Sequence, residues 1–307
     1  MRTNVCFRIA CILHGVTVFL ATCAIAQQDT GFRWVNKLPE QRTPLLKHGT
    51  FDSVSNKAEV GYYVYLPLGY DSEQSANAAT RYPVVYYLHG GRPGGEHKSI
   101  GMAEIFDDAM RAGRVPPMIY VFVNGGAMSH YDFPAKQSFG ETALVKELVP
   151  HIDANYRTIA RREGRGIEGF SQGGRGSARI MFKYPELFCS AAPMGGGHEH
   201  EKHAAEHGGR ETSGIQFDAG NNTYDLAQDY ARRMKEWPLR ILVGVGKQDM
   251  NYEANLDWMR RLTELGIPFE RAIAGDAPHS AARCYRNLGD QVMLFHARSF
   301  TAARSGN

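Results

Sequence analysis

Residues 166–174 read GIEGFSQGG, and this short stretch decides the fold. Its first three residues predict a short buried strand, and the run from 172 to 183 predicts a helix directly behind it. A sharp turn between a strand and a helix crowds the backbone on both sides of its central residue, so glycine is required there. The glycines that flank Ser171 therefore predict a tight turn that holds its hydroxyl up toward solvent.

On both sides of this turn, short β-branched and aromatic runs alternate with amphipathic stretches, beginning after about Ala58. This alternation predicts an α/β fold with a mostly parallel central sheet and helices on both faces. Strands are expected at 60–66, 84–88, 118–123, 166–168, 190–193, 239–245 and 269–273. Helices are expected at 143–155, 172–183, 252–265 and 291–300.

The N-terminal residues differ in composition from the rest. Two arginines precede an apolar stretch at 9–20, and the sequence Ala-Ile-Ala at 24–26 precedes the polar Gln27. This pattern predicts a signal peptide over residues 1–26, and therefore a secreted or periplasmic protein. Because the apolar stretch is short for a bilayer span, a retained anchor is a lesser alternative. A lipid anchor is a further alternative, since residues 20–23 loosely match a bacterial lipoprotein box.

Residues 27–307 predict a single domain, because no linker, charge block or repeat divides them. Between 195 and 230 the alternation of strand and helix patterns is lost, and Gly, His, Glu and Asn are frequent. This segment therefore predicts an irregular insertion or lid above the sheet. The formal net charge of +3 is small and its basic residues are dispersed, so we expect neither a nucleic-acid partner nor stable membrane insertion. The expected partner is a small-molecule or polysaccharide substrate, and the oligomeric state stays open.

Cysteine usage leaves one question open. Cys6, Cys11 and Cys23 lie in or beside the predicted signal peptide, which leaves Cys189 and Cys284 in the mature protein. Two thiols in an oxidising compartment can pair. Two separate buried thiols are equally compatible with the sequence, because spacing alone does not bring their Cα atoms within bonding range.

Two residues further along the chain supply what Ser171 needs to react, since an unactivated hydroxyl is a poor nucleophile at neutral pH. Asp249 follows the predicted strand at 239–245, and His279 lies in a loop after the next strand. Open α/β sheets place functional groups at such strand ends. We therefore predict Ser171 as nucleophile, His279 as base and Asp249 as the acid that orients it. Weaker candidates are Asp276, Glu253 and Asp257 for the acid, and His89 for the base.

Four histidines at 198, 200, 203 and 207 offer an alternative chemistry. His203 and His207 lie one helical turn apart with Glu206 nearby, a spacing that metal sites use. Glycine and glutamate mixed among these histidines favour a solvated lid instead. Serine chemistry requires no metal, so we expect neither a metal nor a cofactor.

Most of the mature chain resembles the esterase-D-like group of α/β-hydrolases, and within it carbohydrate esterase family one, which includes feruloyl and acetylxylan esterases. The matching segments are 63–67 with 69–70, 82–90, 147–153 with 156–157, and 169–174, together with Asp249 and His279. The resemblance implies the α/β-hydrolase fold and the same roles for Ser171, Asp249 and His279. The segment 195–230 departs from the family, so substrate preferences do not transfer directly.

The resemblance also suggests residues around the serine. The stretch from His89 to Gly91 is similar to the histidine-glycine loop of esterases, which implies that the N–H of Gly91 helps to bind the negative oxygen formed during acyl transfer. Gln172, at the start of the predicted helix, would donate the second N–H of this oxyanion hole, and it replaces the methionine usual there. Tyr131 lies where relatives carry substrate-contacting residues, so it is a candidate for substrate binding.

These features predict a secreted serine carboxylesterase that acts on acyl or feruloyl esters of carbohydrates. One alternative is an acyltransferase of the mycolyltransferase-like type, which would pass the acyl group to a sugar or lipid. Another is a non-catalytic binding protein on a hydrolase fold, since a fold does not dictate function.

Overall fold

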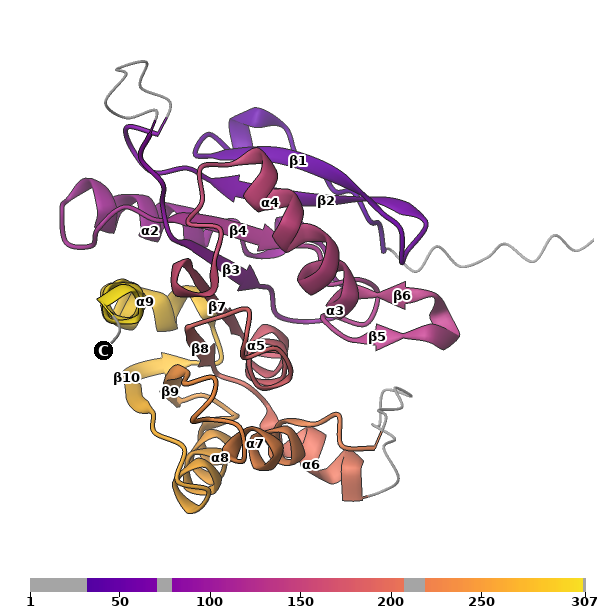
Figure 1. The fold of residues 1–307 in the computed structure, drawn as a ribbon, viewed down its shortest axis with the longest axis vertical. Coiled ribbons are helices and arrows are strands. Elements are labelled where there is room, and N and C mark those ends of the chain that lie inside the picture. The colour runs from indigo at the N-terminus through magenta and orange to yellow at the C-terminus, as the bar shows by residue number, and fades with distance from the viewer. Residues whose placement is uncertain (1–31, 71–78, 207–218, 306–307) are drawn as a thin grey trace, which may run out of the picture. The chain divides into compact units, whose positions relative to one another are not determined.

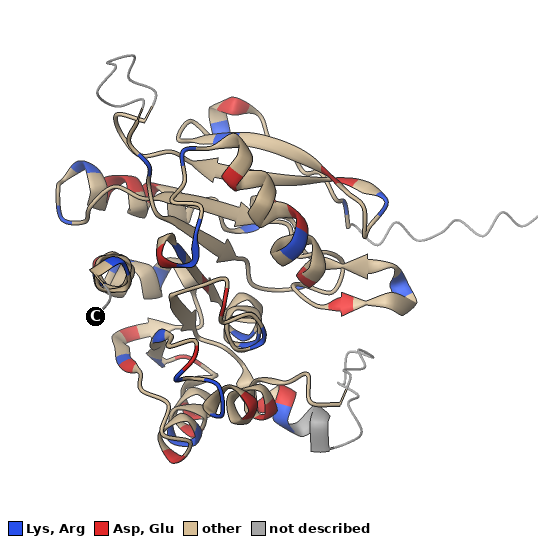
Figure 2. Ribbon diagram, in the orientation of Figure 1, with Lys and Arg blue, Asp and Glu red and all other residues tan. Residues whose placement is uncertain are grey.

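The computed structural model describes residues 32–70, 79–206 and 219–305, all within one compact unit from Gly31 to Asn307. The predicted signal peptide and its cysteines lie outside the described residues. Within the described ranges, none of the helices combines the length and apolar character that a membrane crossing needs. Basic and acidic residues are interspersed along the elements, as Figure 2 shows.

One large sheet organises the fold (Figure 1). Its eight strands run in the order β1-β2-β4-β3-β7-β8-β9-β10. β2 pairs antiparallel with β1 and β4, and the neighbours from β4 to β10 pair in parallel. The strands are β1 (Leu46–Ser53), β2 (Ala58–Tyr65), β3 (Val84–Leu88), β4 (Ile119–Val123), β7 (Arg165–Phe170), β8 (Ser190–Met194), β9 (Arg240–Gln248) and β10 (Glu270–Pro278). β5 (Asp132–Phe133) and β6 (Ser138–Phe139) form a separate hairpin.

Helices cover both faces of this sheet. The helices are α2 (Met102–Arg111), α3 (Gly140–Thr142), α4 (Val149–Asn155), α5 (Gln172–Lys183), α6 (His198–Glu206), α7 (Thr223–Ala231), α8 (Tyr252–Glu264) and α9 (Ala281–Ser305). A π-helical segment, η4 (Ala143–Leu148), joins α3 to α4. Short 3-10 turns lie at η1 (Glu40–Arg42), η2 (Glu96–Ser99), η3 (Pro134–Lys136) and η5 (Arg162–Gly164).

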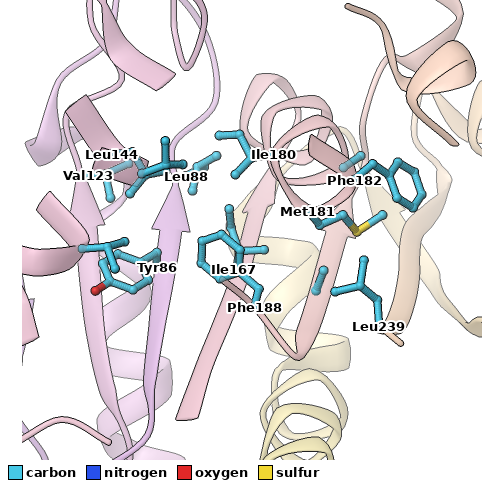
Figure 3. Packing of buried hydrophobic residues seen from close by; sticks show 14 of the residues in the cluster. Tyr86, Leu88, Val123, Leu144, Ile167, Ile180, Met181, Phe182, Phe188 and Leu239 are labelled. Carbon is cyan, nitrogen blue, oxygen red and sulfur yellow. The ribbon is translucent and has the colours of Figure 1, made fainter. Parts of the chain in front are cut away.

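The core is divided by the sheet into two apolar layers, because successive strand residues point to opposite faces. Val84 and Tyr86 of β3 belong to the apolar layer on one face, which Figure 3 shows in part and to which residues of η4, α4, α5, α7 and α8 also contribute. Val85 and Tyr87 of the same strand pack with α2 and α9 on the other face. β3 is therefore buried from both sides, which explains why its sequence is continuously apolar.

The predicted α/β architecture is confirmed, and the strand at 84–88 and the helix at 172–183 have the predicted bounds. The prediction of an irregular segment at 195–230 is wrong over its described residues, since α6 and α7 lie there. Ala227 and Tyr230 of α7 are buried in the core, so part of this segment belongs to the main body of the fold. Residues 207–218 of the predicted lid lie outside the described residues. α9 is also much longer than the predicted helix at 291–300.

Candidate active site

Ser171 occupies the tight turn between β7 and α5 that the sequence predicts. Its backbone has φ 60° and ψ −115°, a conformation that residues other than glycine rarely adopt. Its N–H donates to the Met194 carbonyl at 2.9 Å, and its own carbonyl accepts from the Arg175 N–H at 3.0 Å. The turn is thus held by β8 on one side and by the first turn of α5 on the other. Such strain is tolerated only where the surroundings fix it.

The glycines beside the serine allow this turn to pack against β3. A Cβ built on Gly169 would lie 2.5 Å from the Leu88 carbonyl oxygen, and one built on Gly173 would lie only 1.9 Å from it. Both distances are far shorter than van der Waals contact, and the obstacle is backbone rather than a flexible side chain. The requirement for glycine at these positions therefore comes from the neighbouring strand as well as from the turn itself.

Replacing Gly173 with alanine is expected to lower the free energy of unfolding by about 3 kcal/mol, because the new methyl group must push β3 away from α5. Urea denaturation measures this change. Gly101→Ala is the matched control, since Gly101 has φ −61° and its Cβ would meet nothing within 4 Å. Equal stability of the two variants would show that the turn does not need this close approach.

The structure brings Ser171, His279 and Asp249 together in one hydrogen-bonded chain. His279 Nε2 lies 2.8 Å from Ser171 Oγ, and His279 Nδ1 lies 2.8 Å from Asp249 Oδ1. Asp249 directly follows β9 and His279 directly follows β10, so all three residues sit at the carboxyl ends of parallel strands. Asp257, one of the alternative acids, instead interacts with Tyr224 and Arg260.

The surroundings of the chain suit proton transfer. The Asp249 side chain has no exposed surface, and its Oδ1 also accepts the Asn251 N–H at 2.8 Å. The His279 side chain is 20% exposed, and its ring packs 4.9 Å from the Phe170 ring. A carboxylate at Nδ1 favours the tautomer whose Nε2 lone pair faces the serine hydroxyl. This arrangement can take a proton from Ser171 and return it to a leaving group.

The two predicted oxyanion donors belong to two segments beside the serine, the loop after β3 and the start of α5. Gln172 N–H is at the first position of α5, and within the described part of the chain neither it nor Gly91 N–H has a hydrogen-bond acceptor. The loop that contains Gly91 passes close to the serine, since a Cβ built on Gly90 would lie 3.3 Å from Ser171 Cβ. Gly91 has φ 73°, which glycine adopts without strain. Their roles stay predictions.

His89, the weaker candidate for the base, braces this loop. Its Nδ1 lies 3.1 Å from the Gly90 carbonyl oxygen, so Nδ1–H donates there. Its Nε2 accepts the N–H groups of Gly95 and Gly125, each at 3.3 Å. Burial lowers the pKa of His89 to about 4, so the ring is neutral at neutral pH. Both ring nitrogens are occupied by the backbone, which leaves His89 a structural part of the oxyanion loop.

The prediction that Tyr131 contacts substrate is not supported by its position. Tyr131 is 1% exposed, and its hydroxyl donates to the Glu201 carboxylate. The Arg179 guanidinium lies 3.5 Å from the centre of its ring. Tyr131 is therefore built into the interior of the protein, where a polar contact and a cation hold it. The sequence motif around it gave no sign of these partners, because they come from distant helices.

A buried charged cluster, formed by Arg179, Glu141, Glu201 and Lys183, joins α6 to the helix behind the serine. Arg179 lies between Glu141 at 3.5 Å and Glu201 at 3.3 Å. Lys183 also binds Glu141, and Glu201 accepts the Thr223 N–H at 2.8 Å. Two positive and two negative side chains thus neutralise one another. Sequence analysis missed this cluster because its members look like surface residues.

Arg179→Met is expected to lower the free energy of unfolding by about 3–5 kcal/mol, because it leaves Glu201 and Glu141 buried without their shared cation. Thermal or urea denaturation would measure this loss of stability. Arg260→Met serves as control, since the Arg260–Asp257 pair is largely exposed, and no measurable change is expected. A variant at 179 as stable as the native chain would contradict an energetic role for the cluster.

The alternative site chemistries find little support among the described residues. There, no group of three metal-binding side chains could hold an ion. His198 stacks on Trp258 with ring centres 4.0 Å apart, while the His203 side chain and His207 lie outside what the structure describes. Cys189 and Cys284 are free and buried, so of the two alternatives left open by the sequence the structure has the separate thiols. Burial raises the pKa of the Cys189 thiol to about 11 and that of Cys284 to about 12.

Comparison with known proteins shows the family to which the chain belongs. The model of the Esterase family, described as putative esterase, matches residues 53–266. An esterase of Mycobacterium tuberculosis is 32% identical over 170 residues, covering 54% of this chain and 35% of that protein. The endo-1,4-beta-xylanase/feruloyl esterase of Xylanibacter ruminicola is 32% identical over 143 residues, covering 44% of this chain and 19% of that protein. The chain thus spans about a third or less of these curated relatives.

Among solved structures, a ferulic acid esterase has a similar fold, with a TM-score of 0.68 at 20% identity. The similarity covers 82% of this chain and 98% of that one. Identity at this level speaks to the fold alone, and it identifies the sheet described above as an α/β-hydrolase sheet. The resemblance inferred from the sequence is confirmed at the level of family and fold.

Proposed function

The chain belongs to the Esterase family, and we propose that it is a serine carboxylesterase that hydrolyses carboxylic esters with Ser171 as nucleophile. The observation that carries this proposal is the continuous hydrogen-bonded chain from Ser171 through His279 to Asp249. Three side chains so distant in sequence meet in this order and geometry chiefly in enzymes that transfer acyl groups.

The proposed reaction has two steps. Ser171 Oγ attacks the ester carbonyl carbon while its proton passes to His279 Nε2, and the resulting oxyanion binds the N–H groups of Gly91 and Gln172. The bond to the alcohol then breaks, and His279 gives the proton to the departing oxygen. Water then attacks the acyl carbonyl carbon while its proton passes to His279. The bond to Ser171 Oγ breaks, His279 returns the proton to Oγ, and the carboxylic acid leaves.

We further propose that the substrate is an acyl or feruloyl ester of a carbohydrate outside the cytoplasm. Support comes from the Xylanibacter ruminicola relative, whose name combines xylanase and feruloyl esterase, and from the predicted signal peptide at 1–26. Export directed by such a leader would bring the enzyme to plant or other polysaccharides. An intracellular thioester substrate fits this location less well.

A panel of esters tests both levels of the proposal. The purified chain should hydrolyse p-nitrophenyl acetate, and it should release ferulate or acetate from decorated xylan. Added sugar acceptors should not divert the acyl group from water. Absence of hydrolysis on every ester would refute the esterase proposal, while activity on simple esters without release from xylan would refute only the carbohydrate substrate. Efficient transfer to the acceptors would favour an acyltransferase.

A further inference from the structure

A side-chain hydrogen bond connects the two segments that carry the predicted oxyanion donors. Arg92 Nη2 donates to Gln172 Oε1 at 3.2 Å. Arg92 directly follows Gly91 in the loop after β3, and Gln172 bears the second N–H at the start of α5. The bond therefore joins the two walls of the predicted oxyanion hole, at side chains that need not touch the substrate.

Arg92, which donates this hydrogen bond from the loop, is held in place by neighbouring residues. The Arg92 guanidinium lies 5.5 Å from the centre of the Tyr131 ring, within the range of a cation–π contact. Tyr131 is fixed in turn by its hydrogen bond to Glu201. The Gly91 carbonyl accepts the Ser129 hydroxyl at 2.5 Å, which fixes the peptide between Gly91 and Arg92. Arg92 thus has a defined position from which to hold Gln172.

We propose that Arg92 and Gln172 are positioning residues, and that their hydrogen bond sets the distance between the N–H groups of Gly91 and Gln172. The inference rests on the proposed esterase function. It also gives Tyr131 a role that its burial permits, as the platform on which Arg92 lies. Helix α6 would then influence the site through Glu201, Tyr131 and Arg92, without contributing a group to the reaction.

The spacing of the donors matters because hydrogen bonds to an oxyanion act over a narrow range. Donors work at about 2.7–3.1 Å from the negative oxygen, and a displacement of about 1 Å can cost roughly a hundredfold in rate. A loosened loop would still bind the ester, since the ground-state carbonyl makes weaker demands on these donors. Loss of the bond should consequently lower kcat more than it raises KM.

Gln172 offers a matched pair of variants that keep the backbone N–H. Methionine has a similar length but no oxygen to accept the Arg92 proton, whereas glutamate accepts it with a negative charge. With p-nitrophenyl acetate, Gln172→Met should lower kcat about tenfold with KM changed less than about twofold. Gln172→Glu should keep kcat within about threefold of the native value.

Arg92→Met completes a double-mutant cycle. Arg92→Met should lower kcat about as much as Gln172→Met does. The double variant should have a kcat no more than about twofold below that of the slower single variant, because both changes remove the same bond. Each of three results would overturn the proposal. Gln172→Met could keep the native kcat, Gln172→Glu could lose as much kcat as Gln172→Met, or the loss of kcat in the double variant could equal the product of the two single losses. The two Gln172 variants alone are sufficient to test the proposal. A contrary result from them would therefore stand even if Arg92→Met folded poorly.

Failure of the esterase proposal would look different. In that case Ser171→Ala would hydrolyse the ester as fast as the native chain, whatever the Gln172 variants do. If Ser171→Ala is inactive and Gln172→Met is fully active, the nucleophile stands and only the positioning role is refuted. Melting temperatures of the Gln172 variants, measured beside that of the native chain, separate a local effect on kcat from a general loss of stability.

Discussion

Ser171→Ala is expected to lower kcat/KM for p-nitrophenyl acetate by about 10⁴-fold or more, because the variant lacks the hydroxyl on which the proposed acyl-enzyme forms. The loss should appear in kcat, since the substitution removes only the Oγ atom that attacks the ester. A fluorophosphonate probe should label the native chain and leave the variant unlabelled. Initial rates and an intact-mass measurement of the labelled protein would record both results.

Ser177→Ala is the matched control for this experiment. Ser177 lies on the same helix α5, is buried, and donates to the Gly174 carbonyl at 3.0 Å without contacting the hydrogen-bonded chain. Its replacement should leave both hydrolysis and labelling unchanged. If Ser171→Ala kept its activity, the nucleophile would have to be another residue and the proposed mechanism would be wrong.

Asp249→Asn is expected to lower kcat by about 10⁴-fold at neutral pH. The amide can present its NH₂ group to His279 Nδ1, which favours the tautomer that has its proton on Nε2. That tautomer cannot accept the proton of Ser171, so the nucleophile is no longer activated. The KM for the ester should change little, because Asp249 is buried behind the imidazole and faces no substrate.

The alternative acid Asp257 provides the control for this second prediction. Its carboxylate accepts hydrogen bonds from Tyr224 and Arg260 on the outer side of α8. Asp257→Asn should keep kcat within about twofold of the native value, as expected for a surface change away from the site. The opposite pattern, with Asp257→Asn inactive and Asp249→Asn active, would exchange the roles of the two residues.

The parts of the fold that follow simple rules could be predicted from the sequence. β3 is buried on both faces, so its sequence is a continuous apolar run. The serine turn could be predicted from the glycines that its tight packing requires. The meeting of Asp249 and His279 beside the serine could be predicted because strand ends of parallel sheets gather functional groups. These signals are local or depend on a general property of the fold, so they do not require knowledge of distant contacts.

The segment around α6 could not be predicted in this way. His198 and Glu201 are polar residues in a glycine-rich stretch, yet the structure buries both. A ring stacked on Trp258 and a cation from Arg179 compensate for their burial, and both partners lie far away in the sequence. The burial of Tyr131 was not predicted for the same reason. Hydrophobic patterning cannot identify polar groups that are buried because a remote partner satisfies them.

The serine turn and the two residues proposed to activate the serine depend on different stretches of chain. Ser171 follows a central strand, whereas Asp249 and His279 are supplied by β9 and β10 at one end of the sheet. A molecule in which that end has unravelled would retain the hydroxyl but not its reactivity. Titration with a phosphonate reagent would consequently count molecules whose C-terminal strands are correctly assembled, and could serve as a gauge of refolding yield or storage damage.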